Sequence, residues 1–132
     1  MILSPPRQTS ADDDGYLSAS EIARLKLNAD WVLLSACNTT SADGTPGAEG
    51  FSGLAKAFFH AGARSLLVSH WSVESETTVL LTTAMLEEYE ASPAQAKAEA
   101  HRKAMLALID TPGYAHPLFW APFVVVGEGG PR

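Results

Sequence analysis

Two short apolar runs on either side of an amphipathic segment constrain the fold of this chain more than any other feature. The segments 31–36 and 65–69 lack the polar and apolar alternation of a half-exposed strand, which is typical of strands buried on both faces of a sheet. Between them, residues 49–61 predict a helix that ends at Gly62. Its apolar stripe consists of Phe51, Leu54, Ala55, Phe58 and Phe59. The order strand, helix, strand predicts a right-handed βαβ unit.

The N-terminal part of the chain predicts one strand fragment, a loop and a short helix. Met1–Ser4 resembles the end of a strand, because the prolines that follow cannot donate ladder hydrogen bonds. Residues 7–17 are polar, and their consecutive aspartates lack the alternating spacing of a calcium loop. Ser18 and Glu21 have the spacing of a capping box, which predicts a helix through about Leu25.

The C-terminal half predicts two helices and a last strand. One helix is expected over residues 75–89, and a second begins at the N-cap signal Ser92-Pro93-Ala94-Gln95 and runs through about Ile109. Residues 111–113 break that helix, and residues 123–126 form a strand. This order predicts an α/β fold with three layers, α-β-α, in a single domain over residues 1–132 that lacks N-terminal strands.

Composition excludes several classes of function. The 132 residues contain nine basic and fifteen acidic side chains, a net charge of −6, so no basic patch favours nucleic acid. No stretch approaches the roughly 20 apolar residues of a membrane span, and no signal peptide is evident. We therefore expect a soluble cytoplasmic protein that binds neither nucleic acid nor membrane. A single cysteine cannot form an internal disulfide or a thiolate zinc site, and no cofactor or metal is expected.

The single cysteine, Cys37, follows the first apolar run. A glycine-rich polar loop over residues 38–47 comes next, so Cys37 is expected at the carboxyl end of a strand. In open α/β sheets this edge is where ligands and chemistry gather. From position alone, two interpretations stay open: Cys37 is a nucleophile, or it is a small buried structural residue.

Four motifs in sequence order resemble the CHAT domain, a caspase-like cysteine-peptidase domain commonly found beside tetratricopeptide repeats. They are Leu34-Ser35-Ala36-Cys37-Asn38-Thr39, the segment 50–65, His70-Trp71-Ser72-Val73 and the segment 114–123. The resemblance implies a caspase-like fold with a mostly parallel sheet. It also implies that Cys37 is the nucleophile and that Ser35, with Asn38 beside the nucleophile, contacts a protein or peptide substrate.

In the caspase pattern, the catalytic histidine stands about 50 residues before the cysteine. Here 36 residues precede Cys37 and none is histidine. The resemblance therefore implies that the chain is the C-terminal portion of the domain, with the base supplied from outside it. We expect the isolated chain to be inactive as a peptidase.

Histidines within the chain offer weaker candidates. His70 ends the second buried strand and is a substitute base, a pocket wall or a satisfied hydrogen-bonding group. Trp71 is either a substrate-groove aromatic or a core or helix-capping residue. His60 and His101 lie next to apolar helical stripes, which predicts packing. His116 is expected to order the turn before the last strand.

Acidic side chains raise the question of a pocket for a basic substrate side chain. These carboxylates can instead lie on the polar faces and in the first turns of helices, where they interact favourably with the helix dipole. Ser75 stands where the family often has an aspartate, which argues against an inherited acidic pocket. The six carboxylates are Asp43, Glu74, Glu76, Glu87, Glu88 and Glu90.

Two functions are compatible with these patterns. The first is a cysteine endopeptidase domain. The second is an inactive caspase-like module for protein interaction, with a tetratricopeptide-repeat region or the missing N-terminal half as partner, or with self-association through an exposed sheet edge.

Overall fold

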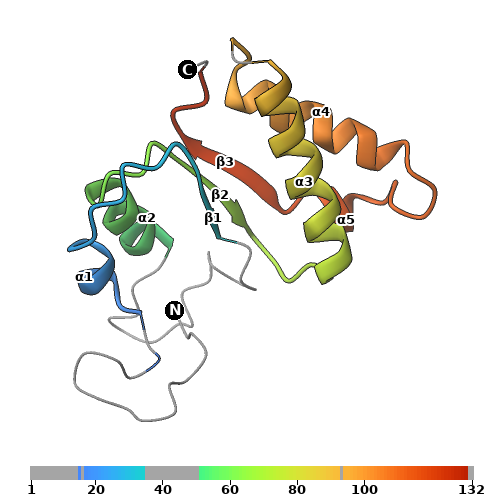
Figure 1. Cartoon of the computed structure of the whole chain (residues 1–132). Helices are drawn as coiled ribbons and strands as arrows, with labels where there is room; N and C mark the ends of the chain where they lie inside the picture. The colour runs from blue at the N-terminus through green and yellow to red at the C-terminus, as the bar shows by residue number, and fades with distance from the viewer. Residues whose placement is uncertain (1–14, 16, 35–50, 93, 131–132) are drawn as a thin grey trace.

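The structure is a computed structural model that describes residues 15, 17–34, 51–92 and 94–130 (Figure 1). Its elements are α1 (Ala19–Ile22), β1 (Val32–Leu34), α2 (Phe51–His60), β2 (Ser65–Ser69), α3 (Ser75–Ala91), α4 (Lys97–Ile109), α5 (Pro117–Trp120) and β3 (Phe123–Gly127). This content confirms the α/β class. The strand expected at residues 1–4 and the loop expected at 38–47 lie outside the described residues.

The sheet has three strands in the order β1-β2-β3. β1 and β2 are parallel, with Leu34 opposite Val68, so the predicted strand-helix-strand unit is confirmed. β3 runs antiparallel to β2, with Phe123 opposite Ser69. Two of the three strands therefore share one direction, and the reversed direction of β3 was not indicated by the sequence pattern.

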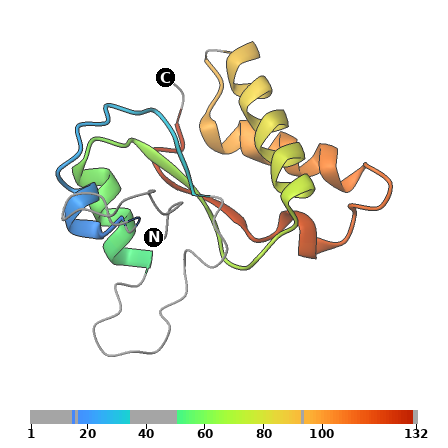
Figure 2. The same ribbon diagram turned by 60° about the horizontal axis from the view of Figure 1, so that its bottom comes forward.

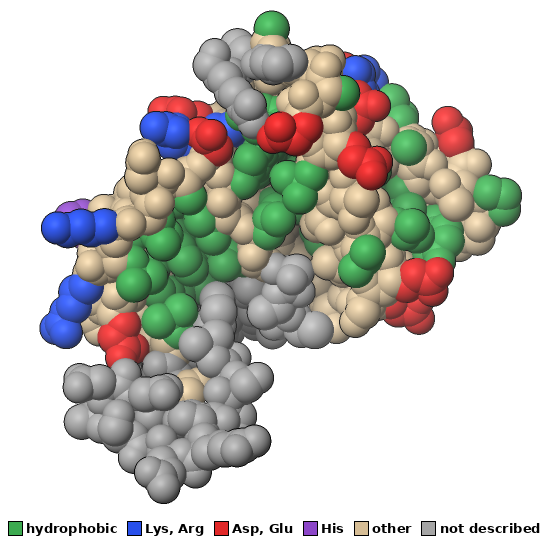
Figure 3. Space-filling view, in the orientation of Figure 1, with side chains coloured by type: hydrophobic (Ala, Val, Ile, Leu, Met, Phe, Trp, Pro, Cys, Tyr) green, Lys and Arg blue, Asp and Glu red, His purple; other side chains and the backbone are tan. Residues whose placement is uncertain are grey.

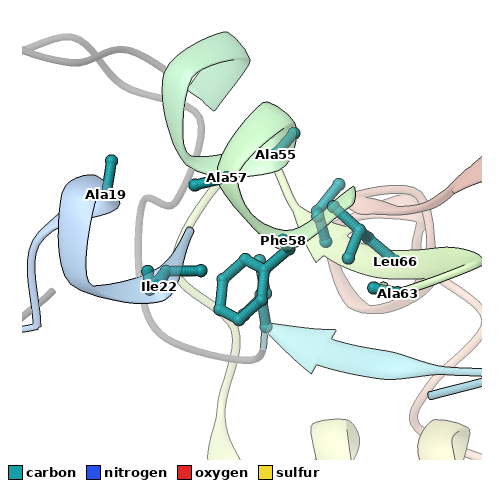
Figure 4. Close-up of a cluster of buried hydrophobic side chains, with 9 residues drawn as sticks. Ala19, Ile22, Ala55, Ala57, Phe58, Ala63 and Leu66 are labelled. Carbon is teal, nitrogen blue, oxygen red and sulfur yellow. The ribbon is translucent and has the colours of Figure 1, made fainter. Parts of the chain in front are cut away.

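Helices pack against both faces of the sheet (Figures 1 and 2). One core cluster joins α1 and α2 to side chains of β1 and β2, including Leu66 and Val68. The other joins α3 and α4 to the opposite face, including Leu67. In Figure 4, Phe58 of α2 points into the first cluster beside Ile22 of α1. Successive residues of β2 thus serve opposite clusters, as expected for a strand.

Helix α1 begins with the predicted capping box. The Glu21 amide donates to Ser18 Oγ at 3.3 Å, and the Ser18 amide donates to Glu21 Oε2 at 2.8 Å. The backbone hydrogen bond from Ser18 lowers the pKa of Glu21 below its ordinary value. The helix ends at Ile22 rather than near Leu25, because the amides of Arg24 and Leu25 bond to carbonyls only three residues earlier.

The predicted start of α4 at Ser92 is wrong. The helix begins at Lys97, and its N-cap residue Ala96 makes no side-chain capping hydrogen bond. Instead, the amides of Lys97 and Ala98 donate to the carbonyls of Gly130 and Gly129 at 3.3 and 3.1 Å. Backbone of the C-terminal tail therefore satisfies amides that a local N-cap would otherwise serve.

The two histidines expected to pack differ in outcome. His60 is exposed at the last position of α2, so the prediction for it is wrong. His101 of α4 is buried, at 7% exposure, as predicted. Its Nε2 atom is buried without a hydrogen-bond partner among the described residues. Burial lowers the pKa of His101 below its ordinary value of 6.5.

We predict that Gly127→Ala destabilises the protein more than Gly113→Ala does. Both glycines have positive φ, 101° and 92°, so both variants carry left-handed strain. An added Cβ at Gly127 would lie 2.6 Å from the Arg64 carbonyl and 2.8 Å from the Phe59 ring, whereas at Gly113 it meets nothing within 4 Å. Overpacking predicts an additional cost of about 1–3 kcal/mol at Gly127. Urea unfolding of the two variants measures it, and equal costs would contradict the packing argument.

We also predict that neutral His101 makes stability depend on pH. Because its pKa is lowered in the folded state, the unfolded chain binds this proton more readily. The stabilisation is complete above about pH 6.5, the ordinary value expected in the unfolded chain, and is lost progressively as the pH falls from there toward the lower pKa of the folded state. The melting temperature of His101→Leu should therefore fall less than that of the wild type between about pH 7 and pH 5.5. His60→Leu, altered at an exposed position, should retain the wild-type dependence.

Candidate functional site

The carboxyl ends of β1 and β2 lie at the same edge of the sheet. Their parallel register places Leu34 opposite Val68, and both strands leave the sheet in the same direction. Cys37 follows Leu34 by three positions in the sequence, and His70 follows Val68 by two. Cys37, Ser35 and Asn38 themselves lie outside the described residues. The structure therefore locates the strand that leads to Cys37 and describes the neighbouring strand end in detail.

His70 is anchored at this edge through its backbone. Its amide donates to the carbonyl of Pro122 at 3.0 Å, which joins the end of β2 to the residue before β3. The residue is exposed, so its imidazole lies at the surface of the molecule. This position allows contact with a bound ligand at the edge.

Trp71 combines an exposed ring with a fixed indole nitrogen. Its Nε1 atom donates to the carbonyl of Leu118 in α5 at 3.2 Å, and 38% of the residue is exposed. A carbonyl near the end of a helix needs such a donor, so this contact corresponds to the helix-capping alternative. Leu118 is 54% exposed. An aromatic and an aliphatic side chain thus lie next to the carboxyl end of β2, both accessible to solvent.

The short helix α5, which the sequence pattern did not reveal, holds this surface in place. His116 is its N-cap, and its Nδ1 atom accepts a hydrogen bond from the Leu118 amide at 3.1 Å. Pro117 occupies the first turn, where a missing amide costs nothing. Trp120 Nε1 donates to the Ala115 carbonyl at 3.2 Å. His116 therefore orders the turn as predicted, and the His-Pro pair was the available signal for the helix.

Two of the candidate acidic residues, Glu76 and Glu88, make structural contacts. A hydrogen bond to Glu76 is the largest cause of a raised pKa for Tyr114, in the segment before α5. Glu88 pairs with Lys103 at 2.9 Å between α3 and α4. These contacts favour the polar-face interpretation for Glu76 and Glu88. Glu74, Glu87 and Glu90 are exposed, and Asp43 lies outside the described residues.

Neither a metal site nor a membrane-spanning helix is found among the described residues. Within the described ranges, no group of three or more His, Cys, Asp or Glu side chains is placed to hold a metal ion. No helix in the described part combines the length and apolar character needed to cross a membrane.

An open hollow of about 520 Å³ lies between the turn after α2 and the end of β3, at the opposite end of β2 from His70. Its lining residues are Phe59, Gly62, Ala63, Arg64, Gly127 and Glu128.

Comparisons with known proteins agree with the motifs. The family model of the CHAT domain matches residues 1–128. The chain is 30% identical over 113 residues to "Tetratricopeptide repeat protein 28" of Mus musculus, and the match covers 85% of this chain. It spans only 4% of the length of that relative. No solved structure matches. With almost its whole length matched by the family model, this chain belongs to the CHAT domain family.

Proposed function

We propose that the chain is the C-terminal part of a caspase-like cysteine endopeptidase domain, with a three-layer fold and Cys37 as the nucleophile. The parallel register of β1 and β2 carries this proposal, because the carboxyl ends of the two strands lie at one edge of the sheet and precede Cys37 and His70 in the sequence. Membership of the CHAT family supports the same assignment, because Cys37 lies in one of the motifs through which the chain resembles this family. The domain would act on protein or peptide substrates in the cytoplasm, where a thiol stays reduced.

In the proposed reaction, the thiolate of Cys37 attacks the scissile carbonyl carbon and forms a tetrahedral intermediate. A free cysteine has a pKa of about 8.5, so a histidine base must take the thiol proton near neutral pH. That histidine lies outside these 132 residues and later gives the proton to the leaving amine. Backbone amides at the strand end stabilise the oxyanion, and water then releases the acyl group from sulfur.

Substrate contacts would come from both strand ends. Ser35 and Asn38 flank the nucleophile in the sequence, and Ser35 would line the pocket for the side chain before the scissile bond. Trp71 would present its exposed ring to apolar parts of the substrate, because its bond to Leu118 fixes the indole. His70, exposed at the end of β2, would contact the substrate or raise the thiolate fraction of Cys37.

A second function is favoured by the position of β1. It is an edge strand of the described sheet, and Leu33 within it is 38% exposed. Unpaired strand edges favour pairing with another chain. The alternative is thus an inactive module that binds a tetratricopeptide-repeat region, an N-terminal half of the domain or a second copy of itself.

We predict that the purified 132-residue chain does not cleave a peptide library, because the chain lacks the inherited base. Cys37→Ala and His70→Asn serve as controls for any activity that is found. Turnover that disappears in both variants would contradict the prediction and identify His70 as the base. Turnover that survives Cys37→Ala would exclude Cys37 as the nucleophile.

Completing the domain should restore reactivity if the first function is correct. We expect a cysteine-directed caspase-type probe to label Cys37 only after the N-terminal half is supplied, with Cys37→Ala as the negative control. A completed, folded domain that stays unlabelled would favour the inactive module.

We also predict that the isolated chain self-associates through the sheet edge, which light scattering would show as a mass above that of the monomer. A monomeric mass together with a sharp melt would argue against self-association.

A further inference from the structure

The outer face of α3 lacks the uniformly polar character expected of a surface helix. The inner face of this helix buries Leu81, Met85 and Tyr89 in the core cluster that includes Leu67 of the sheet. On the outer side, the positions are occupied partly by apolar residues, although a helix that packs on one side only normally has polar or charged residues there. The positions exposed on this outer face are Glu76, Val79, Leu80, Thr83, Glu87 and Glu90.

Two large apolar side chains lie at the centre of the outer face, with carboxylates on both sides of them. Val79 is 61% exposed and Leu80 is 40% exposed. Glu76 lies one turn before Val79 and forms a hydrogen bond with Tyr114, and Glu87 lies two turns after Leu80. The helical rise places Glu76 and Glu87 about 16 Å apart along the axis. Figure 3 shows hydrophobic side chains between acidic ones over the part of the molecule that α3 occupies in Figure 1.

The sequence around α3 supplies negative charge and no positive charge. Residues 65–96 include five glutamates and neither lysine nor arginine. Glu88 pairs with Lys103 of α4 at 2.9 Å, whereas Glu87 belongs to none of the three ion pairs found in the described part of the chain. The outer face of α3 is therefore apolar at its centre and acidic toward both ends.

We propose that the outer face of α3 binds an amphipathic helix of a partner protein, with Lys or Arg on both sides of its apolar stripe. The stripe would cover Val79 and Leu80 and remove their exposed surface from water. The basic side chains would pair with Glu76 and Glu87, and this complementarity would select the partner. An anionic membrane surface or a nucleic acid would be repelled by the same carboxylates.

A helical partner fits this surface because two packed helices share one side-chain spacing. Rows of side chains on one helix can then lie in the grooves of the other over several turns, so that both carboxylates are reached at once. An extended segment rises more than twice as far per residue and does not keep this match. None of the residues on the outer face takes part in the proposed reaction, so binding here is independent of Cys37.

The probe is a labelled, end-capped, alanine-rich helical peptide that copies the spacing of the outer face. It has Lys at the positions that correspond to Glu76 and Glu87, and Leu at those of Val79 and Leu80. A second peptide has this pattern in reverse order, for the opposite helix direction. Matched peptides carry Gln instead of Lys, and one control carries a central Pro. Fluorescence anisotropy with the 132-residue chain at low salt should show the better Lys peptide binding about tenfold more tightly than its Gln match. The Pro peptide should not bind, because proline breaks the helix.

Two variants test the apolar centre and the acidic ends separately. Leu80→Gln should weaken binding of the Lys and Gln peptides alike, by about tenfold. Glu87→Gln should reduce the preference for Lys about threefold and leave the affinity for the Gln peptide unchanged. Leu106→Gln and Asp110→Asn alter an exposed leucine and an exposed carboxylate of the α4 region, and these matched controls should bind as the wild type does. If Leu80→Gln does not fold, Val79→Thr, which keeps the side-chain shape at the more exposed position, should weaken both peptides about threefold.

Failure of both Lys peptides to bind overturns the proposal, as does binding that Leu80→Gln or Val79→Thr leaves unchanged. A preference for Lys that is absent, insensitive to salt or fully retained in Glu87→Gln overturns the role of the carboxylates. Equal binding of the Pro peptide overturns the helical form of the partner. Binding of anionic lipid vesicles in place of the peptides would identify a membrane surface and overturn a protein partner. Peptidase assays of the completed domain test the proposed reaction separately.

Discussion

Burial of β2 on both faces is the constraint on which the rest of this structure depends. All five residues from Ser65 to Ser69 are buried, and alternate side chains enter the two core clusters. Removing apolar surface from water on both sides of one strand fixes two helical layers relative to each other. The buried hydroxyl of Ser65 is satisfied by donation to the Glu128 carbonyl at 2.6 Å. This bond also holds the tail beyond β3 against the start of β2.

A rigid central strand has a direct consequence for the candidate site. The residues that follow β2, His70 and Trp71, begin at a fixed point, and each is tied to the segment around α5. α5 is short, but a side-chain cap from His116 and a hydrogen bond from Trp120 restrain it. Exposed side chains on a restrained scaffold lose little conformational entropy when a ligand binds. This is the physical basis for considering Trp71 as a binding residue.

Local sequence patterns predicted the parts of the fold that local forces determine. The apolar run of β2, the stripe of α2 and the capping box at Ser18 each depend on contacts within one element or on simple burial. The start of α4 depends on carbonyls of Gly129 and Gly130, about 30 residues away in the sequence. The direction of β3 and the exposure of His60 likewise follow from tertiary packing. At the candidate site, the role of His70 and Trp71 as substrate contacts stays a prediction from the sequence, and the contact between Trp71 and Leu118 could be found only in the structure.

Strand β1 connects the described sheet to the candidate nucleophile of the proposed function. This strand is paired on one side with β2, and its carboxyl end leads toward Cys37. No described residue pairs with its other edge, and a strand placed there would supply hydrogen bonds on the second side and restrict β1 further. Pairing of β1 and any arrangement of the following segment that requires an ordered β1 would stabilise each other. Under the proposed function, completion of the sheet and the arrangement of Cys37 would therefore be thermodynamically linked.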